Sequence, residues 1–303
     1  MTKIIKLFCS ILNIPEHHIS GTQIIGGMTN NNYLITTNNK EKYVLRLSGQ
    51  NSNLLINRQY EFDNVKSLLS LNISPDIIFY DVENGHKITK YIESSQTLSP
   101  YSISRYIPEI TEHLNKLHNS EIKFNNEFNF LAEYLKYRNI INKRNIEIDT
   151  EFLQIEQKFL NLYNVLLDYG ISLAPCHNDL VAENILVVEH ETNDTQSKKQ
   201  IFFIDWEYSG MNDPMWDIAA LFLESNFTAR NEDLFLSYYF RDLSQEELKI
   251  KKQQIHIYKI LQNQLWYLWT LIKEQGGDDF GNYKQKRLLS SKMLYTDYIK
   301  AYS

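Results

Sequence analysis

The pattern of apolar and polar positions divides the chain into a strand-rich first third and a largely helical remainder. At the start, apolar residues recur at helical spacing from Ile4 to Leu12, which predicts an amphipathic helix. Five short apolar segments follow, bounded by Gly, Asn or Pro, and a helical pattern at residues 58–69 interrupts them. The segments are two strands within residues 22–37, joined at Gly26-Gly27, and strands at 42–47, 76–80 and 86–92. They predict a small antiparallel sheet that carries one helix.

Beyond residue 99 the spacing is mostly helical, and a pair of apolar strands interrupts it within residues 175–208. The predicted helices are residues 101–118, 130–140, 151–169, 214–225, 231–240, 245–275 and 284–302. A polar stretch at residues 189–200 separates the two strands and is expected to be exposed. These elements predict an α+β fold, with a sheet-containing N-terminal lobe at 1–93 and a helical C-terminal lobe at 94–303.

The strand pair carries the candidate chemistry. His177, Asp179 and Asn184 form an H-x-D-x-x-x-x-N motif that runs into the first strand, and the second strand ends at Asp205. In kinases a loop Asp of this kind is the base for the acceptor hydroxyl, while the Asn and a second Asp hold Mg²⁺ on ATP. Each residue alone would suit a turn, because Asp and Asn favour turns. The ordered set, followed by strands, favours phosphoryl transfer.

A buried ion pair is predicted in the N-terminal lobe. Glu61 shares a helical stripe with Val65 and Leu68, and a carboxylate on an inward stripe needs a partner. Arg46 lies on the face of its strand opposite to the leucine side chains and is the predicted cation. The pair would have the role that a strand Lys and a helix Glu have in kinases. The alternative is that Glu61 sits at the edge of the stripe and meets solvent.

Other groups of the same lobe suit a nucleotide. Backbone amides at the glycine turn, with Thr29 and Asn30, could cover phosphates, although a Gly-Gly pair is also common in simple hairpins. The segment Lys90, Tyr91 and Ile92 would offer backbone groups to an adenine ring. The sequence contains no Walker A motif, which excludes a P-loop ATPase.

A row of tryptophans marks a candidate acceptor pocket. Trp266 and Trp269 lie on a helical row shared with polar residues, beside the apolar stripe of the long predicted helix. With Tyr208 and the aromatic residue Tyr283 they could form a cage for a quaternary ammonium group, each cation–π contact contributing about 0.5–2 kcal/mol. Tryptophans three residues apart also occur in ordinary cores, and the spacing leaves both interpretations open.

Composition narrows the class of partner. The chain has 303 residues and a net charge of −6 without a basic block, which argues against nucleic acid and against a polybasic membrane patch. Its two cysteines, Cys9 and Cys176, fit free thiols of a reducing compartment. Lys6 interrupts the first apolar run, no signal cleavage site follows, and no apolar stretch is long enough for a bilayer. We expect a cytoplasmic protein with a small-molecule substrate and no membrane insertion.

The whole set of motifs resembles the choline/ethanolamine kinases, within the group that includes the aminoglycoside phosphotransferases. The matching pieces are Gly-Gly-Met-Thr-Asn30, Val-Leu-Arg-Leu47, Glu61, His-Asn-Asp179 with Asn184, Ile-Asp-Trp-Glu-Tyr208, Trp266 with Trp269, and Phe280-Gly-Asn-Tyr283. The resemblance implies a kinase-like bilobal fold and phosphorylation of choline with ATP and Mg²⁺.

By match of motif, the resemblance also assigns roles to residues. Asp179 would be the base, Asn184 and Asp205 the Mg²⁺ ligands, and Arg46 with Glu61 the phosphate-side pair. The ammonium head would meet the aromatic residues Tyr208, Trp266, Trp269 and Tyr283. His177, Asp213 and Asp217 would be structural, with Asp217 bracing the catalytic loop.

The chain departs from the usual family pattern in its loop and after its second Asp. Val181, Ala182 and Glu183 replace a polar residue and a glycine in the loop, and Trp206 replaces a Phe. Ethanolamine, thiamine or an aminoglycoside therefore stays open as the acceptor, because carboxylates such as Glu207, Asp278 and Asp279 would suit a primary ammonium. A nucleotide-binding scaffold without activity is the third possibility, and the intact base and metal residues argue against it.

Overall fold

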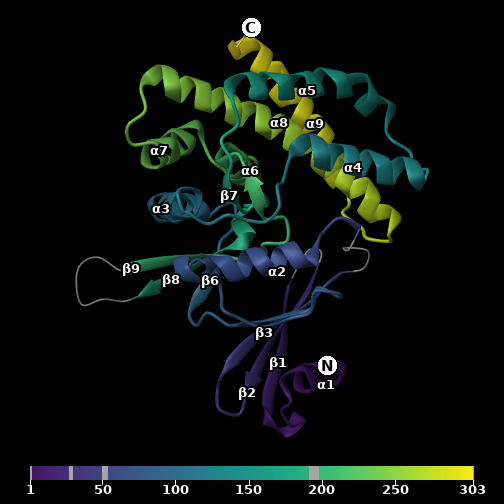
Figure 1. Cartoon of the computed structure of the whole chain (residues 1–303), viewed down its shortest axis with the longest axis vertical. Helices are drawn as coiled ribbons and strands as arrows, with labels where there is room; N and C mark the ends of the chain where they lie inside the picture. The colour runs from purple at the N-terminus through teal and green to yellow at the C-terminus, as the bar shows by residue number, and fades with distance from the viewer. Residues whose placement is uncertain (1, 27–29, 50–53, 191–197, 303) are drawn as a thin grey trace. The chain divides into compact units, whose positions relative to one another are not determined.

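The computed structural model describes residues 2–26, 30–49, 54–190 and 198–302, and the chain divides into two compact units (Figure 1). Unit 1 contains residues 1–96 and 186–207, and unit 2 contains residues 97–185 and 208–303. The sequence analysis places the lobe boundary after Glu93 and assigns 186–207 to the C-terminal lobe. In the structure this second segment groups with unit 1, so the chain passes between the units more than once.

Unit 1 is built on the predicted five-stranded antiparallel sheet, in the order β1-β2-β3-β5-β4. Its strands are β1 (Ile19–Gly26), β2 (Asn31–Thr37), β3 (Lys42–Leu47), β4 (Ile77–Tyr80) and β5 (Lys87–Lys90). A second sheet has the order β6-β8-β9, with β6 (Ser95–Thr97), β8 (Ile185–His190) and β9 (Lys198–Phe203). The predicted strand pair before Asp205 therefore exists as β8 and β9, which are neighbours.

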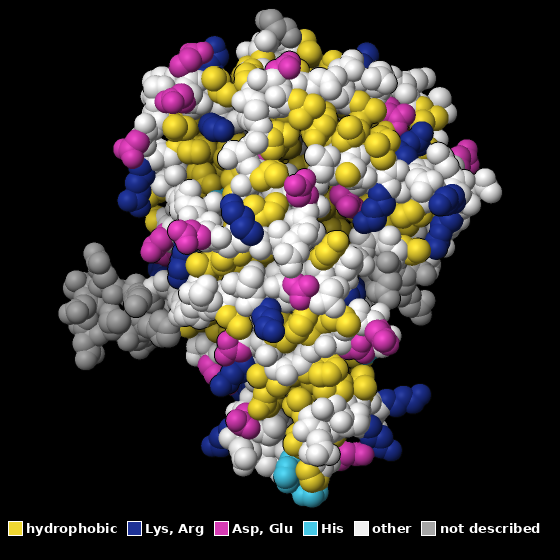
Figure 2. Space-filling model, in the orientation of Figure 1, with side chains coloured by type: hydrophobic (Ala, Val, Ile, Leu, Met, Phe, Trp, Pro, Cys, Tyr) yellow, Lys and Arg dark blue, Asp and Glu magenta, His cyan; other side chains and the backbone are white. Residues whose placement is uncertain are grey.

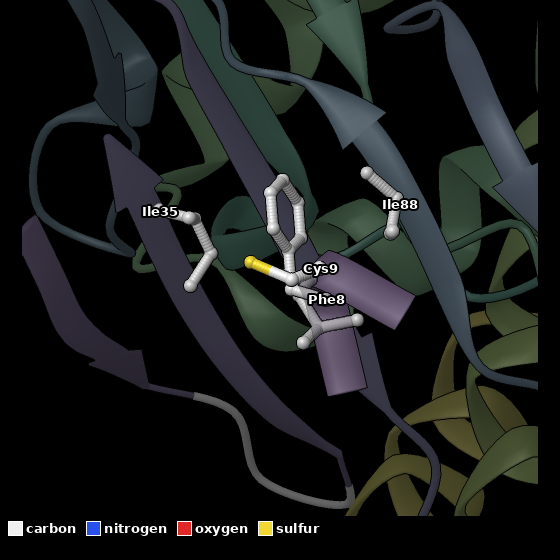
Figure 3. Close-up of a cluster of buried hydrophobic side chains, with 5 residues drawn as sticks. Phe8, Cys9, Ile35 and Ile88 are labelled. Atoms are coloured by element: carbon white, nitrogen blue, oxygen red, sulfur yellow. The ribbon is translucent and has the colours of Figure 1, made fainter. Parts of the chain in front are cut away.

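The N-terminal helix α1 (Thr2–Leu12) supplies the core on one face of the five-stranded sheet. Phe8 and Cys9 of α1 pack with Ile35, Leu45 and Ile88 from β2, β3 and β5 (Figure 3). The helical spacing of the apolar residues in this segment is what presents Phe8 and Cys9 to the sheet.

Helix α2 (Arg58–Ser67) carries Glu61. Asn57 begins the helix, because its side chain accepts hydrogen bonds from the backbone N–H groups of Gln59 and Tyr60. The chain continues as a 3₁₀ turn at Leu68–Leu71, and Asn72 ends it in the left-handed conformation with φ 50°. The α-helix therefore ends slightly earlier than the predicted limit at residue 69.

Unit 2 is mostly helical, as predicted, with α8 packed against four of its helices (Figure 1). The helices are α3 (Ile107–His118), α4 (Phe130–Lys143), α5 (Thr150–Tyr169), α6 (Pro214–Glu224), α7 (Ala229–Tyr239), α8 (Gln245–Gln275) and α9 (Tyr283–Tyr302). Ser244 and Glu247 form a capping box at the start of α8, and almost every residue from Gln254 to Lys273 is buried.

Two details of unit 2 differ from the sequence expectation. The helix predicted at residues 101–118 begins as a 3₁₀ turn, Ile103–Tyr106, and α3 starts only at Ile107, with Pro108 in its first turn. The strand before the catalytic motif, β7 (Ala174–Cys176), pairs with β10 (Gly210–Asn212), so that Cys176 lies opposite Gly210. The pairing brings the start of the motif loop next to the residues that follow Tyr208.

The surface in view carries charges of both signs. Figure 2 shows Lys and Arg interspersed with Asp and Glu over the visible face of the described residues. Among the helices that the structure describes, none combines the length and the apolar composition that a bilayer crossing requires.

Candidate active site

The predicted pair of Arg46 and Glu61 is present in unit 1 and is buried. The Arg46 Nη1 atom lies 2.7 Å from Glu61 Oε1, and Arg46 Nη2 donates to Glu61 Oε2 at 2.9 Å. Arg46 is 4% exposed and Glu61 is 1% exposed, so the alternative of a solvent-facing carboxylate is wrong. Two parallel N–H···O bonds are the geometry that favours Arg over Lys as a carboxylate partner.

The pair belongs to a larger charge cluster of three cations and three carboxylates within unit 1, all of them buried except Asp205, which is partly exposed. Its members are Arg46, Arg58, Lys87, Glu61, Asp205 and Glu207. Arg58 Nη1 contacts Glu61 at 2.8 Å and Glu207 at 3.0 Å, and Lys87 Nζ contacts Glu61 at 3.0 Å. Arg46 Nη1 also lies 2.9 Å from Asp205 Oδ1. The equal numbers of each sign allow so many charges to be buried together.

The cluster shifts the pKa of its members in opposite directions. Burial alone would raise the pKa of Glu61, but the charges of Arg46 and Lys87 hold it well below the usual range. Burial, followed by the negative charge of Asp205, raises the pKa of Glu207. Burial lowers the pKa of Lys87, and the neighbouring Arg46 lowers it further. Glu61 is therefore the carboxylate on which the positive charges converge.

Gly85 is a structural requirement of the cluster. Its carbonyl accepts hydrogen bonds from Arg46 Nη2 at 3.2 Å and from Ser48 Oγ at 2.8 Å. The residue has φ +72°, and a Cβ atom there would collide with the side chains of Arg58 and Ser48. A side chain at position 85 would therefore push Arg58 away from its carboxylates.

The remaining predicted nucleotide residues of unit 1 differ in how the structure places them. Asn30 is buried, and its Nδ2 atom donates to Glu207 at 3.3 Å, while Thr29 lies outside the described residues. The backbone N–H groups of Lys90 and Tyr91 donate to Asp76 and Lys42 carbonyls at 2.9 and 3.0 Å. The Ile92 carbonyl accepts the N–H of Ser95 at 3.3 Å, so an adenine contact by this segment would have to use its other backbone groups, which include the Ile92 N–H.

The predicted catalytic motif forms a compact loop in unit 2. A 3₁₀ turn at Ala182–Asn184 follows Asp179, and the Asn184 Nδ2 atom donates to the Asp179 carbonyl at 2.9 Å and to its carboxylate at 3.4 Å. The amide nitrogen of Asn184 thus faces Asp179, and the amide oxygen, the atom that a Mg²⁺ ion would take, points in another direction. Of the unusual loop residues, Ala182 is buried and Glu183 is exposed.

Asp217 of α6 braces this loop, as expected. Its carboxylate accepts hydrogen bonds from the backbone N–H groups of His177 at 2.8 Å and Asn178 at 2.7 Å. The same carboxylate contacts His118 Nε2 at 3.0 Å, and all four residues are buried. His177 Nδ1 accepts the N–H of Asp179 at 3.3 Å, which gives His177 the supporting role predicted for it.

The hydrogen bonds of Asp217 also explain a group of side chains of the types that bind metal ions. His118, Cys176 and Asp217 offer donor atoms within 4.8 Å of one another. The hydrogen bonds of Asp217 and of His118, whose Nδ1 lies 2.7 Å from the Tyr239 hydroxyl, already use these polar atoms. Burial, with the charge of Asp217, holds the pKa of the Cys176 thiol well above its usual range, so the thiolate that a metal needs is disfavoured. We interpret the group as loop support.

Three of the four predicted cage aromatics are neighbours in unit 2. Trp269 Nε1 donates to the Tyr208 hydroxyl at 2.7 Å, and the Tyr208 and Trp266 rings meet edge-on with centroids 5.4 Å apart. The Trp266 and Trp269 rings are nearly perpendicular, at 89° and 6.2 Å, and Phe280 packs on Trp269 at 5.1 Å. All three side chains are buried, and edge-to-face contacts of this kind occur both in aromatic cages and in ordinary cores.

The fourth aromatic, Tyr283, has a different partner. The Arg287 guanidinium lies over its ring at 4.3 Å and also donates to its hydroxyl, while Glu224 pairs with Arg287. Burial raises the pKa of Tyr283 to about 12 against the charge of Arg287, and the negative charges of Glu224 and, to a smaller extent, Asp179 add to the rise. One face of the Tyr283 ring therefore already holds a cation.

The carboxylates considered for a primary ammonium are all partnered. Asp278 forms an ion pair with Lys273 at 2.7 Å, and Asp279 accepts the N–H of Gly281 at 2.8 Å. Glu207 belongs to the charge cluster of unit 1 through Arg58.

A family model of the choline/ethanolamine kinases matches residues 22–292. The chain belongs to this family. Protein LicA of Haemophilus influenzae is 35% identical over 287 residues, which cover 92% of this chain and 80% of that protein. The kinase is also similar to the crystal structure of choline kinase LicA from Streptococcus pneumoniae, at 38% identity and a TM-score of 0.82, covering 98% of this chain and 99% of that one.

A structure of LicA in complex with AMP matches at 37% identity and a TM-score of 0.81, covering 98% of each chain. These matches confirm the predicted kinase-like α+β fold, and the kinase is a phosphotransferase that acts on an alcohol.

Sequence reasoning missed several residues of the site in the kinase. The sequence could have indicated Arg58 as a partner of Glu61, because it lies three residues earlier on the same helical face. The sequence could not have indicated Lys87, because its position beside Arg46 depends on the register between β3 and β5. Asn178 stood in the motif as an unassigned position, although its side chain links the loop to Tyr208.

Proposed function

We propose that this kinase transfers the γ-phosphoryl group of ATP to the hydroxyl of choline, with Asp179 as the base. The choline oxygen forms a bond to phosphorus, the bond to the leaving ADP oxygen breaks, and the hydroxyl proton passes to the Asp179 carboxylate. The observation that carries the choice of acceptor is the perpendicular arrangement of Tyr208, Trp266 and Trp269. A trimethylammonium group has no N–H to donate, so aromatic faces suit it better than carboxylates.

Ethanolamine is the second candidate, because the family includes ethanolamine kinases. A primary ammonium would need acceptor oxygens, and the candidate carboxylates Glu207, Asp278 and Asp279 are engaged with Arg58, Lys273 and the Gly281 N–H. This pairing favours choline over ethanolamine.

The chemistry of the donor set fits Mg²⁺. Asn184 supplies an amide oxygen and Asp205 a carboxylate, and hard oxygen ligands of this kind are the ones that Mg²⁺ takes. The two residues belong to different units, so their assignment to one ion rests on the motif and on family membership. When bound, the ion would neutralise negative charge on the phosphates of ATP. Arg46, held by Glu61, would supply positive charge on the phosphate side.

The first test measures ATP consumption with Mg²⁺ against choline, ethanolamine, thiamine and an aminoglycoside. We expect a strong preference for choline. Turnover of another acceptor alone would keep the phosphoryl-transfer chemistry and refute the choline assignment. Turnover of none of the four would contradict the proposed function.

The second test replaces the base. Asp179→Asn should lower kcat by about 10²–10⁴-fold, the usual contribution of a general base, and leave ATP binding nearly unchanged. Binding of a non-hydrolysable ATP analogue, measured by calorimetry, is the control. A variant with near-wild-type kcat would show that another group takes the proton.

A further inference from the structure

Asn178, the residue before the predicted base, has an unusual combination of properties. It is fully buried and it adopts a left-handed backbone conformation, with φ +66°. Non-glycine residues rarely adopt this conformation, and Asn is among the few that tolerate it. A conformation of this kind in a buried loop is kept only where the surrounding contacts determine it.

The hydrogen bonds of Asn178 join the motif loop to the strand that follows Tyr208. Its Nδ2 atom donates to the Tyr208 carbonyl at 3.0 Å and to the Gly210 carbonyl at 3.4 Å. Its Oδ1 atom accepts from Asn212 Nδ2 at 2.9 Å. Both ends of the amide are therefore used, and both lead to residues 208–212 of unit 2.

The backbone of Asn178 is fixed as well. Its N–H donates to Asp217 at 2.7 Å, and its carbonyl accepts the indole N–H of Trp216 at 3.0 Å. With these two bonds α6 holds the peptide groups on either side of the residue. The side chain can then act as a spacer between a fixed loop and Tyr208.

We propose that Asn178 is a positioning residue that sets the separation between the Asp179 carboxylate and the ring of Tyr208. The inference rests on the proposed function, in which the carboxylate takes the proton and Tyr208 contacts the ammonium group. The hydroxyl and ammonium ends of choline are joined by two carbon atoms, so their separation is short and varies only within a narrow range. A shift of Tyr208 relative to Asp179 therefore misplaces one end whenever the other is bound.

The chemistry of the amide explains why Asn occupies the position. An Asn side chain combines a donor for the Tyr208 carbonyl with an acceptor for Asn212, and it tolerates positive φ. Asp has the same shape but would place a carboxylate against two carbonyl oxygens. Gly accepts the backbone conformation without strain and removes the three side-chain hydrogen bonds.

The test compares Asn178→Gly with Asn212→Ala. The first variant removes the bonds to Tyr208, Gly210 and Asn212. The second removes the bond to Asn178 Oδ1 and the acceptor of the Asp213 N–H, and it leaves the link to Tyr208 in place. For Asn178→Gly we expect kcat/KM for choline to fall by about ten- to one-hundred-fold, with KM for ATP within about twofold of wild type. For Asn212→Ala we expect a similar loss of thermal stability and a much smaller kinetic effect.

Two further arms make the result decisive. Asn178→Asp should be at least as impaired toward choline as the Gly variant, because its shape is kept and its donor is lost. Equal choline kinetics for Asn178→Gly and Asn212→Ala at equal melting temperature would overturn the inference and leave the proposed function intact. A wild-type protein that turns over none of the four acceptors would overturn the proposed function, and this inference with it.

Discussion

Replacement of Glu61 by Gln tests how the charge cluster is held together. Glu61 is the carboxylate that contacts all three buried cations, at 2.7 Å to Arg46, 2.8 Å to Arg58 and 3.0 Å to Lys87. The amide is nearly the same size, so the variant removes one negative charge without leaving a cavity. The three cations would then face only Asp205 and Glu207.

The expected cost follows from burial. Removing one member of a buried ion pair destabilises a protein by about 3–5 kcal/mol, because the opposite charge stays buried without compensation. The side chain of Glu61 is 0% exposed, so solvent screening does not reduce this figure. An unfolding entropy of about 2.1 cal/mol/K per residue over 303 residues means that about 1 kcal/mol shifts the melting temperature by roughly 1.6 °C, so we expect a fall of about 5–8 °C.

Tyr80→Phe is the matched control. The Tyr80 hydroxyl donates to Glu61 Oε2 at 2.6 Å, so this variant removes a hydrogen bond to the same carboxylate and no charge. A hydrogen bond to a charged group contributes about 1.5–3 kcal/mol, and the control should lose less than Glu61→Gln. Thermal unfolding followed by circular dichroism measures both. A melting temperature for Glu61→Gln equal to or above that of Tyr80→Phe would refute the charge argument.

The pH dependence gives an independent check. The cations hold the pKa of Glu61 in the folded protein well below its ordinary value of 4.5. A lowered folded-state pKa contributes stability above the unfolded-state pKa, and this contribution is lost as the pH falls toward the folded-state value. The stability difference between wild type and Glu61→Gln should therefore be full at neutral pH and shrink below about pH 4.5. A difference that grows in acid would contradict the assigned direction.

Two further predictions concern unit 2. Asp217→Asn replaces a carboxylate that accepts hydrogen bonds from the N–H groups of His177 and Asn178. We expect kcat to fall by about tenfold or more while KM for choline changes little. A change in KM alone would contradict the bracing role. Trp269→Phe keeps an aromatic ring but loses the 2.7 Å hydrogen bond to the Tyr208 hydroxyl. In steady-state assays it should raise KM for choline less than Trp269→Ala does, and KM for ATP should be unchanged. Equal effects on choline and ATP would make Trp269 a core residue.

The local pattern predicted those features that depend on spacing along one element. The pairing of Arg46 with Glu61 followed from alternation in a strand and a stripe on a helix, and both residues are buried where the pattern put them. The row of Trp266 and Trp269 likewise came from helical periodicity, and the two rings are neighbours. Periodicity fixes which face a residue occupies, so pairs between predicted faces can be anticipated.

Features that depend on strand register or on competition between side chains could not be predicted from the sequence pattern. Lys87 joins the cluster because it lies opposite Arg46 across two strands, and nothing in either segment alone specifies that register. Tyr283 was predicted as a wall of the cage, but the cation over its ring is Arg287, which lies one helical turn further along α9. The competition between an internal cation and a ligand is decided by packing.

The passage of the chain between its two units constrains how the protein can be divided. Unit 1 is completed only by residues 186–207, which bring Asp205 and Glu207 to its charge cluster. A fragment ending at Gln96 would keep all three cations of the cluster and one of its three carboxylates, Glu61. Such a fragment would carry uncompensated positive charge in its interior and should not fold by itself. Unit 1 is thus not a continuous folding unit, because a chain divided after Gln96 would separate the carboxylates Asp205 and Glu207 from the cations that they contact.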